Sequence, residues 1–97
     1  MSTLVEQVQG RADVRRQGSG DVVRGAARYD LRVRQTYVMA QDGDESRRLA
    51  GLKDVVGTVE APTGMELYID LPDGRRLNFF VSDTYGSIAR MPGSTFP

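Results

Sequence analysis

The sequence predicts an all-β domain, a small antiparallel β-barrel or sandwich of five to six strands. Three observations lead to this fold class. Residues 22–39 and 65–81 alternate apolar and polar side chains with the period of two that sets one face of a strand against a core. Turn-forming residues recur at intervals of about 10 residues. No segment carries the period of a convincing helix, and strands joined in this way close into barrels or stack into sandwiches.

The clearest element is a β-hairpin over residues 65–81. Its turn is Pro72-Asp73-Gly74, in which Gly74 takes the left-handed conformation that closes the hairpin. With Leu71 opposite Arg75, one face carries the apolar pairs Ile69–Leu77, Leu67–Phe79 and Met65–Val81. The other face carries the pairs Asp70–Arg76, Tyr68–Asn78 and Glu66–Phe80. A shift by one residue would set apolar side chains opposite polar ones, so the pattern selects this register.

A long strand is predicted from about residue 22 to 39, with Gly25 as a bulge or bend. One face of this strand is mainly apolar and consists of Tyr29, Leu31, Val33, Tyr37 and Met39. The other face is mainly polar and includes the alternating arginines Arg28, Arg32 and Arg34. Such a division is typical of an antiparallel strand with one face in the core and one in water.

The residues before this strand are less regular. Residues 1–9 fit both a capped helical turn and the start of a strand, so we expect a loosely ordered start there. A strand over residues 11–16 follows, and the Gly/Ser-rich residues 17–21 form a turn. After the long strand, the polar residues 41–46 are expected to form a hairpin tip.

The remaining segments complete one domain that spans residues 1–97. Residues 49–52 form either an edge segment or a single turn, and residues 55–61 form a strand. In that strand Val55 and Val59 point inward, and Gly57 between them marks a close approach of two backbones. Residues 83–86 form a turn, residues 87–91 form a last short strand, and residues 92–97 form a loose tail.

The composition excludes several kinds of chemistry. The chain has no His and no Cys, so it cannot form a Ser/His/Asp or Cys/His nucleophile system or a thiolate metal site. Neither a P-loop nor a dinucleotide-binding glycine motif is present. The acidic residues 42–45 lack the spacing of a calcium loop and indicate a solvated turn. We therefore expect a protein that is not an enzyme and has neither a cofactor nor a metal.

The sequence also predicts a location. The first residues show no basic region followed by an apolar one, and no apolar run reaches the roughly 20 residues that span a membrane. The absence of Cys fits a reducing compartment. We expect a soluble, cytoplasmic protein with no membrane partner.

The net charge is zero but is unevenly distributed, at +3 over residues 1–40 and −3 over residues 41–97. Of the 13 cationic residues, all but Lys53 are Arg. Arg is well suited to planar recognition of carboxylate or phosphate groups. The same preference also arises from the codon usage of a GC-rich genome.

Two outward features are candidates for a binding site. The first is the arginine row on the long strand, and the second is the pair of aromatic rings on the outer face of the hairpin, with a polar neighbour. The six candidate residues are Tyr68, Phe80, Asn78, Arg28, Arg32 and Arg34. Alternatively, the arginines form a solvated face, and the two rings are buried beneath another part of the chain.

The predicted function is binding to another protein or self-association, because outward aromatic rings and long strand edges need cover. The alternative is single-stranded nucleic-acid binding through an Arg/aromatic sheet face. The zero net charge makes this alternative the less favoured one. A small-molecule or lipid site inside the barrel is disfavoured, because Tyr29, Met65 and Phe79 are expected to fill the interior.

Overall fold

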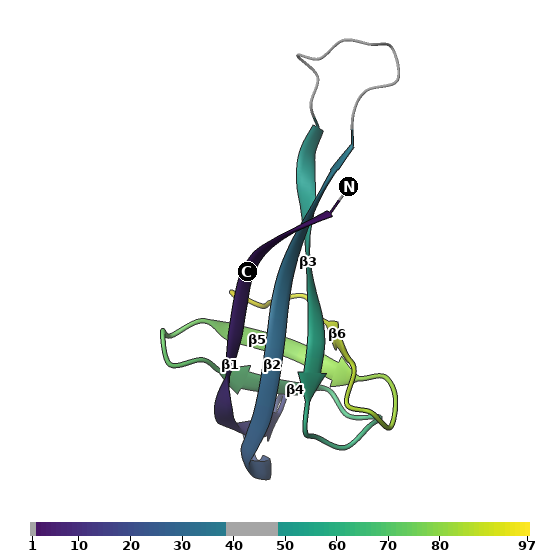
Figure 1. Cartoon of the computed structure of the whole chain (residues 1–97). Helices are drawn as coiled ribbons and strands as arrows, with labels where there is room; N and C mark the ends of the chain where they lie inside the picture. The colour runs from purple at the N-terminus through teal and green to yellow at the C-terminus, as the bar shows by residue number, and fades with distance from the viewer. Residues whose placement is uncertain (1, 39–48) are drawn as a thin grey trace.

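The computed structural model describes residues 2–38 and 49–97, and every regular element in that part of the chain is a β-strand. The strands are β1 (Ser2–Arg16), β2 (Val22–Val38), β3 (Leu49–Val59), β4 (Leu67–Asp70), β5 (Arg76–Val81) and β6 (Ile88–Arg90). They form one antiparallel sheet in the order β3-β2-β1-β4-β5-β6 (Figure 1). The predicted all-β barrel with five to six strands is confirmed.

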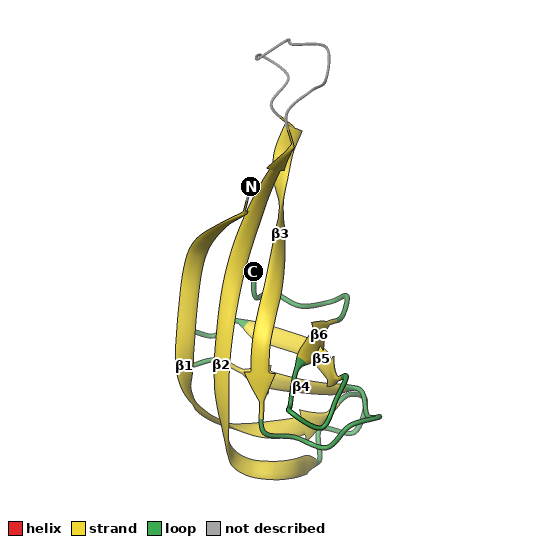
Figure 2. Ribbon diagram, turned by 45° about the vertical axis from the view of Figure 1, so that its right-hand side comes forward, coloured by secondary structure: helices red, strands yellow, loops and turns green. Residues whose placement is uncertain are grey.

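The sheet folds back on itself into a nearly closed barrel with two layers. The long strands β1, β2 and β3 form one layer, and the short strands β4, β5 and β6 cross behind it (Figures 1 and 2). The two ends of the sheet meet where Thr58 bridges Ser87 and the Val59 N–H donates to the Gly86 carbonyl at 3.0 Å. We call this contact the seam. Beyond the barrel, residues 34–38 of β2 and 49–54 of β3 continue as a projecting arm (Figure 2).

The core lies between the two layers and is entirely apolar within the described residues. The predicted inward face of β2 is confirmed for Tyr29, Leu31 and Val33, and that of the hairpin is confirmed from Leu67 to Val81. The other buried apolar residues are Val14, Ala27, Val55, Val59, Leu67, Ile69, Leu71, Leu77, Phe79, Val81, Ile88 and Phe96. Full burial of one large apolar side chain contributes about 1.5–3 kcal/mol. The layers are therefore held together mainly by the side chains that the alternating pattern directs inward.

The hairpin register is confirmed from its turn to Leu67. The Leu71 N–H donates to the Arg75 carbonyl at 2.8 Å, and Gly74 has a φ of 91°. The pairs Asp70–Arg76, Ile69–Leu77, Tyr68–Asn78 and Leu67–Phe79 all form.

The predicted core pair Met65–Val81 is wrong, because Met65 lies outside β4 and is 36% exposed. The Glu66 carbonyl accepts the Gln17 N–H from the β1–β2 turn instead. Because β4 begins only at Leu67, Phe80 and Val81 have no partner in β4, and the predicted pair Glu66–Phe80 is also absent. On its other edge β5 pairs with β6, where Phe80 lies opposite Ala89 and Val81 opposite Ile88.

Two glycine predictions are confirmed. The β1–β2 register shifts opposite Asp13, where Gly25 and Ala26 form the bulge and the Ala26 N–H donates to Asp13 Oδ1 at 2.9 Å. At Gly57 the backbones of β2 and β3 approach closely, because a Cβ atom there would lie 2.0 Å from the Asp30 carbonyl oxygen.

Both chain ends are ordered, contrary to the sequence prediction. Residues 2–9 belong to β1 and pair along β2, so the loose start predicted for residues 1–9 is wrong over that range. The loose tail predicted for residues 92–97 is also wrong. The N–H groups of Thr95 and Phe96 donate to the Arg76 carbonyl at 2.8 and 3.0 Å, and the Phe96 side chain is 0% exposed. The buried Phe96 ring and these two hydrogen bonds hold the tail on β5.

Residues 49–52 were predicted to be either an edge segment or a single turn. They form a strand, since they begin β3. The hairpin tip predicted at residues 41–46, Met39 and the side chain of Tyr37 lie outside the described residues. Residues 87–91 contain the predicted last strand, which runs from Ile88 to Arg90.

Replacing Gly57 by Ala is expected to destabilise the protein by about 2 kcal/mol or more, because the new methyl group overlaps the β2 backbone. The φ of 143° adds strain for any residue with a Cβ atom. Urea unfolding followed by circular dichroism measures the loss. The matched control is Gly18→Ala, where φ is also positive at 88° but no atom lies within 4 Å. An equal loss in the two variants would contradict the role of the close approach.

Candidate functional site

The structure places the six predicted site residues on two layers. Arg28, Arg32 and Arg34 lie on the outward face of β2, whereas Tyr68 lies on β4 and Asn78 and Phe80 lie on β5. In the sheet, β1 separates β2 from β4. The layers turn their outward faces in opposite directions (Figures 1 and 2). The arginines and the aromatic rings therefore do not share one open face.

Tyr68 and Asn78 already have partners within the barrel. The guanidinium carbon of Arg76 lies 4.2 Å from the centroid of the Tyr68 ring, and Arg76 Nε donates to Asp70 at 2.7 Å. The Asn78 side-chain amide donates to the Pro92 carbonyl at 3.2 Å, which helps to hold the tail. Phe80, which is 40% exposed, is the ring of the predicted pair that stays more open.

The arginine row on β2 is partly neutralised by its neighbours. Arg32 lies 3.6 Å from Asp30, and Arg28 lies 3.9 Å from Glu60, the residue that follows β3. Arg34 lies in register between Leu4 of β1 and Asp54 of β3. Ion pairs this exposed contribute about 1 kcal/mol at most, so the row is largely a solvated face.

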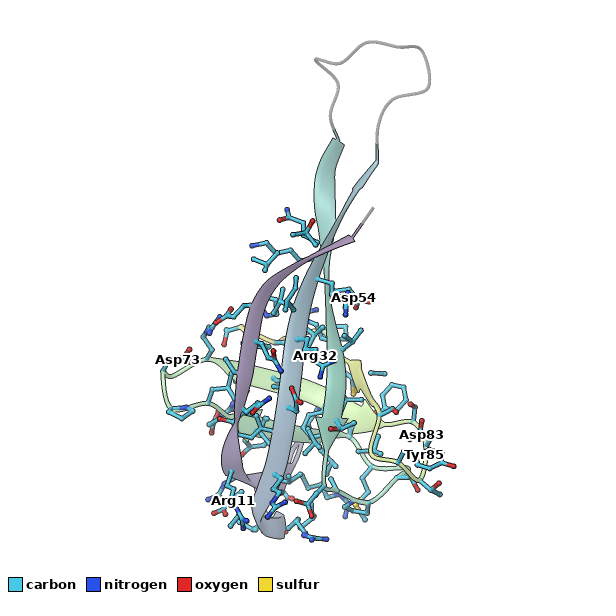
Figure 3. All side chains as sticks on the ribbon, in the orientation of Figure 1. Arg11, Arg32, Asp54, Asp73, Asp83 and Tyr85 are labelled. Carbon is cyan, nitrogen blue, oxygen red and sulfur yellow. The ribbon has the colours of Figure 1, made fainter. Side chains whose placement is uncertain are left out.

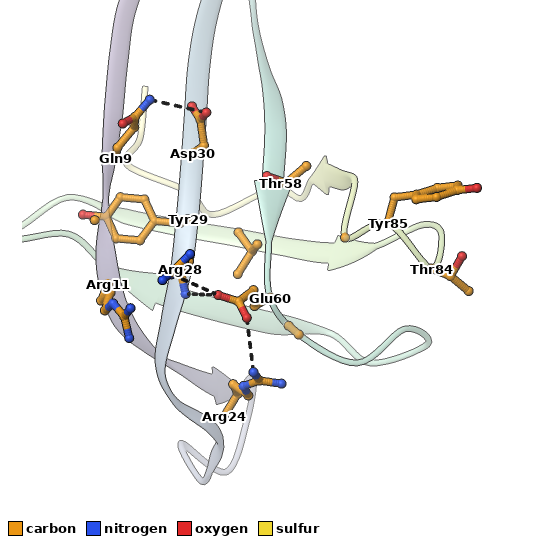
Figure 4. A pocket seen from close by; sticks show the side chains of 14 residues that line it. Gln9, Arg11, Arg24, Arg28, Tyr29, Asp30, Thr58, Glu60, Thr84 and Tyr85 are labelled. Atoms are coloured by element: carbon orange, nitrogen blue, oxygen red, sulfur yellow. Dashed lines mark hydrogen bonds and ion pairs between the residues drawn. The ribbon is translucent and has the colours of Figure 1, made fainter.

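A groove that the sequence did not predict crosses the outward face of β1, β2 and β3 (Figure 4). Its volume is about 930 Å³, and its lining includes Arg11, Arg24, Arg28 and Glu60. The loop of residues 84–86 forms one rim. The buried Tyr29 ring lies between β1 and β2, with its hydroxyl beside Gly10, where a Cβ atom would come within 2.8 Å of it.

The cations of the groove outnumber their carboxylate partners. Glu60 Oε2 accepts Arg24 Nη2 at 3.2 Å, and Glu60 Oε1 accepts the Arg28 N–H at 3.1 Å. Arg11 stands directly opposite Arg28 in the β1–β2 register. Within the described residues no carboxylate lies within 4.0 Å of the Arg11 guanidinium. Like charges in directly opposite positions destabilise a sheet, so this pair is unfavourable for the isolated fold.

The rim of the groove carries Tyr85, whose side chain is 87% exposed. Asp83 Oδ1 accepts the N–H groups of Tyr85 and Ser87 at 2.8 and 3.1 Å and so fixes the predicted turn. Hydrogen bonds from Ser87, first its side chain and then its backbone, hold the pKa of Asp83 below the usual range. The Tyr85 ring points away from the arginines (Figure 4).

Another charged cluster, the Arg75 cluster, joins β1 to the turn of the β4–β5 hairpin. Arg75 Nη1 and Nη2 donate to the two oxygens of Glu6 at 2.9 and 2.6 Å, and Arg75 Nε donates to Asp73 at 2.8 Å. Its guanidinium carbon lies 4.7 Å from the centroid of the Phe96 ring. Hydrogen bonds from Arg75 lower the pKa of Glu6 and of Asp73. Figure 3 shows Asp73 and Tyr85 on opposite sides of the barrel, so this cluster is separate from the groove.

Sequence reasoning missed Arg11, Arg24, Glu60 and Tyr85 as groove residues. Arg11 and Arg28 become neighbours only through the β1–β2 register, which includes the bulge opposite Asp13. The outward alternation of Arg28 was visible in the sequence, but its partner across the sheet was not.

Comparisons of the chain with protein-family models, with curated proteins and with solved structures found no match. Among the described residues, no group of three or more His, Cys, Asp or Glu side chains could hold a metal ion. The same part of the chain contains no helix long and apolar enough to cross a membrane. The geometry of the barrel is therefore the basis for a functional proposal.

Replacing Glu6 by Gln is expected to lower the urea midpoint of unfolding at neutral pH, because Arg75 loses a charged partner. The lowered pKa values of Glu6 and Asp73 mean that their contribution to stability is complete above the unfolded-state pKa of about 4. This contribution is lost as the pH falls through the lower folded-state values. The midpoints of the wild type and Glu6→Gln should therefore converge below about pH 4, as urea titrations at several pH values would show.

The control is Glu66→Gln, because Glu66 is exposed and has no ion pair within the described part of the chain. Its midpoint should stay close to the wild-type value at every pH. A difference in urea midpoint between the wild type and Glu6→Gln that stays constant down to about pH 3 would contradict the proposed linkage.

Proposed function

We propose that this protein is a non-enzymatic β-barrel module that self-associates through the free edge of β3. The supporting observation is the way β3 is paired. β2 pairs along one edge of β3, whereas the other edge is bridged only at the seam, to Gly86 and Ser87 just before β6. Within the described residues β6 lies beside the end of β3 near the seam, but no strand is bridged to Leu49–Val56 on that side. An edge of this length is a template for another strand.

The backbone groups that the free edge offers can be assigned from the seam. The Val59 N–H points away from β2, to Gly86, whereas the Glu60 N–H points toward β2, to Arg28. Because this direction alternates along a strand, the N–H and C=O groups of Lys53 and Val55 also point to the free side. They form a row of unpaired donors and acceptors.

A second copy of the same chain fits this edge. Natural edge strands are protected by shortness, proline, bulges or charge, and residues 49–56 contain no Pro and only the charges of Lys53 and Asp54. Two identical edges can pair antiparallel about a twofold axis, which gives a closed and self-complementary dimer. Leu4 and Val5 of β1 are also exposed, and Leu4 pairs with Arg34 at the base of the arm. These features support self-association over capture of an unrelated chain.

Lys53→Pro tests this proposal. Proline removes an N–H that points to the free edge and leaves the hydrogen bonds to β2 intact, so the barrel should fold. We expect sedimentation equilibrium to show a dimer for the wild type and a dissociation constant raised at least about tenfold for Lys53→Pro.

The matched control is Lys53→Ala, which removes the same charge but keeps the N–H. It should dimerise like the wild type. A wild type that stays monomeric at every concentration would overturn the proposal, and so would equal dissociation constants for the two variants. Circular dichroism confirms that each variant is folded.

Single-stranded nucleic-acid binding by the six sequence-predicted residues stays a prediction. No observation favours it over self-association, because Arg28, Arg32 and Arg34 face away from Tyr68 and Phe80. Binding through those residues would require one strand to pass around the barrel.

A further inference from the structure

The groove on the outward face of β1, β2 and β3 has a charge distribution that the fold itself does not explain. Arg11 and Arg28 are exposed and stand opposite each other on neighbouring strands. Apolar or oppositely charged residues at these positions would stabilise the sheet better. An anion between the two guanidinium groups would turn this repulsion into attraction.

The unbalanced charge of the groove can be estimated from its ion pairs. Three arginines line it, Arg11, Arg24 and Arg28, and the carboxylate of Glu60 lies against the last two. Asp30 also lines the groove, but it accepts Gln7 Nε2 at 3.1 Å and lies 3.6 Å from Arg32. Within the described residues, about two positive charges therefore remain without a carboxylate partner.

We propose that this groove binds a phosphate monoester of nucleotide size, with its phosphate between Arg11 and Arg28. A monoester carries a charge of about −1.5 to −2 and three strong acceptor oxygens, which matches the unpartnered charge better than a single carboxylate does. Guanidinium groups donate paired N–H bonds to such oxygens. Two arginines from adjacent strands can hold one phosphate from both sides.

The size of the groove indicates that the ligand extends beyond its phosphate. The volume of about 930 Å³ is near the upper end of the range for small-molecule sites, about 300–1,000 Å³. Beyond the arginines, the lining continues over the half-buried Ala61 to the loop of residues 84–86. Ala61 and this loop can contact the organic part of the ligand, while the exposed Thr58 and Thr84 carry hydroxyls that can form hydrogen bonds.

Isothermal titration calorimetry with the full chain at low salt tests the site, with adenosine monophosphate, inorganic phosphate and adenosine as probes. We expect saturable binding of the monophosphate, with inorganic phosphate at least about tenfold weaker and no measurable binding of adenosine. Arg11→Gln and Arg28→Gln should each raise the dissociation constant of the monophosphate about tenfold or more. Arg34→Gln is the matched control, because Arg34 lies on the same face of β2 outside the groove. Its affinity should stay within about twofold of the wild type.

A 5′-phosphorylated oligonucleotide distinguishes the two sources of this chemistry. Competition with the monophosphate identifies a strand end as an accepted ligand, and no competition restricts the site to free nucleotides. No binding of the monophosphate, or equal affinity for inorganic phosphate, would overturn the proposal. Equal losses of affinity for the monophosphate in Arg34→Gln and Arg11→Gln would also overturn it. So would polyglutamate that competes with the monophosphate as well as the oligonucleotide does. Lys53→Pro should bind the monophosphate with wild-type affinity, because Lys53 lies outside the groove. The binding test therefore does not depend on whether the protein self-associates.

Discussion

The Arg75 cluster bridges a part of the barrel that backbone hydrogen bonds leave open. β1 pairs with β4 only through Arg15 and Arg16, so the two layers have no backbone hydrogen bonds between the rest of β1 and the β4–β5 hairpin. Arg75 crosses this gap to Glu6 and at the same time contacts Asp73 and the ring of Phe96. A guanidinium can do so because its planar fork donates several hydrogen bonds at fixed angles, which Lys cannot reproduce. One side chain thus joins the first strand, the hairpin turn and the tail.

The gap between β1 and β4 also determines how the interior is filled. The Tyr29 ring reaches β1 beside Gly10, where any Cβ atom would meet the tyrosine hydroxyl. The ring borders both the groove and a smaller cavity of about 360 Å³ beside Pro72. A large aromatic side chain thus packs over a glycine on the neighbouring strand, at the edge of this gap. The same residue lines the groove of the proposed phosphate site.

The sequence predicted the parts of this fold that depend on local contacts. The register from Asp70–Arg76 to Leu67–Phe79 follows from one turn and one alternating pattern, and both are visible in the chain. The burial of Phe96 was not predictable, because it depends on a β5 backbone 20 residues earlier and on a ring that completes a core built elsewhere. The groove was missed for a similar reason. Arg11 and Arg28 are separated by a turn and a bulge, and only their actual register sets them side by side.

The seam has a consequence for how the chain folds. β1, β2 and β3 pair with their sequence neighbours, so this layer can form from contacts of moderate sequence separation. The bridge between Thr58 and Ser87 requires the β4–β5 hairpin and the turn after it to be in place. Contacts of this kind are slow to form, because loop closure precedes any gain from pairing. Until the seam closes, Thr58 and Val59 are open to another chain together with the rest of the free edge of β3. The seam therefore shortens the edge that a folding chain exposes to its neighbours.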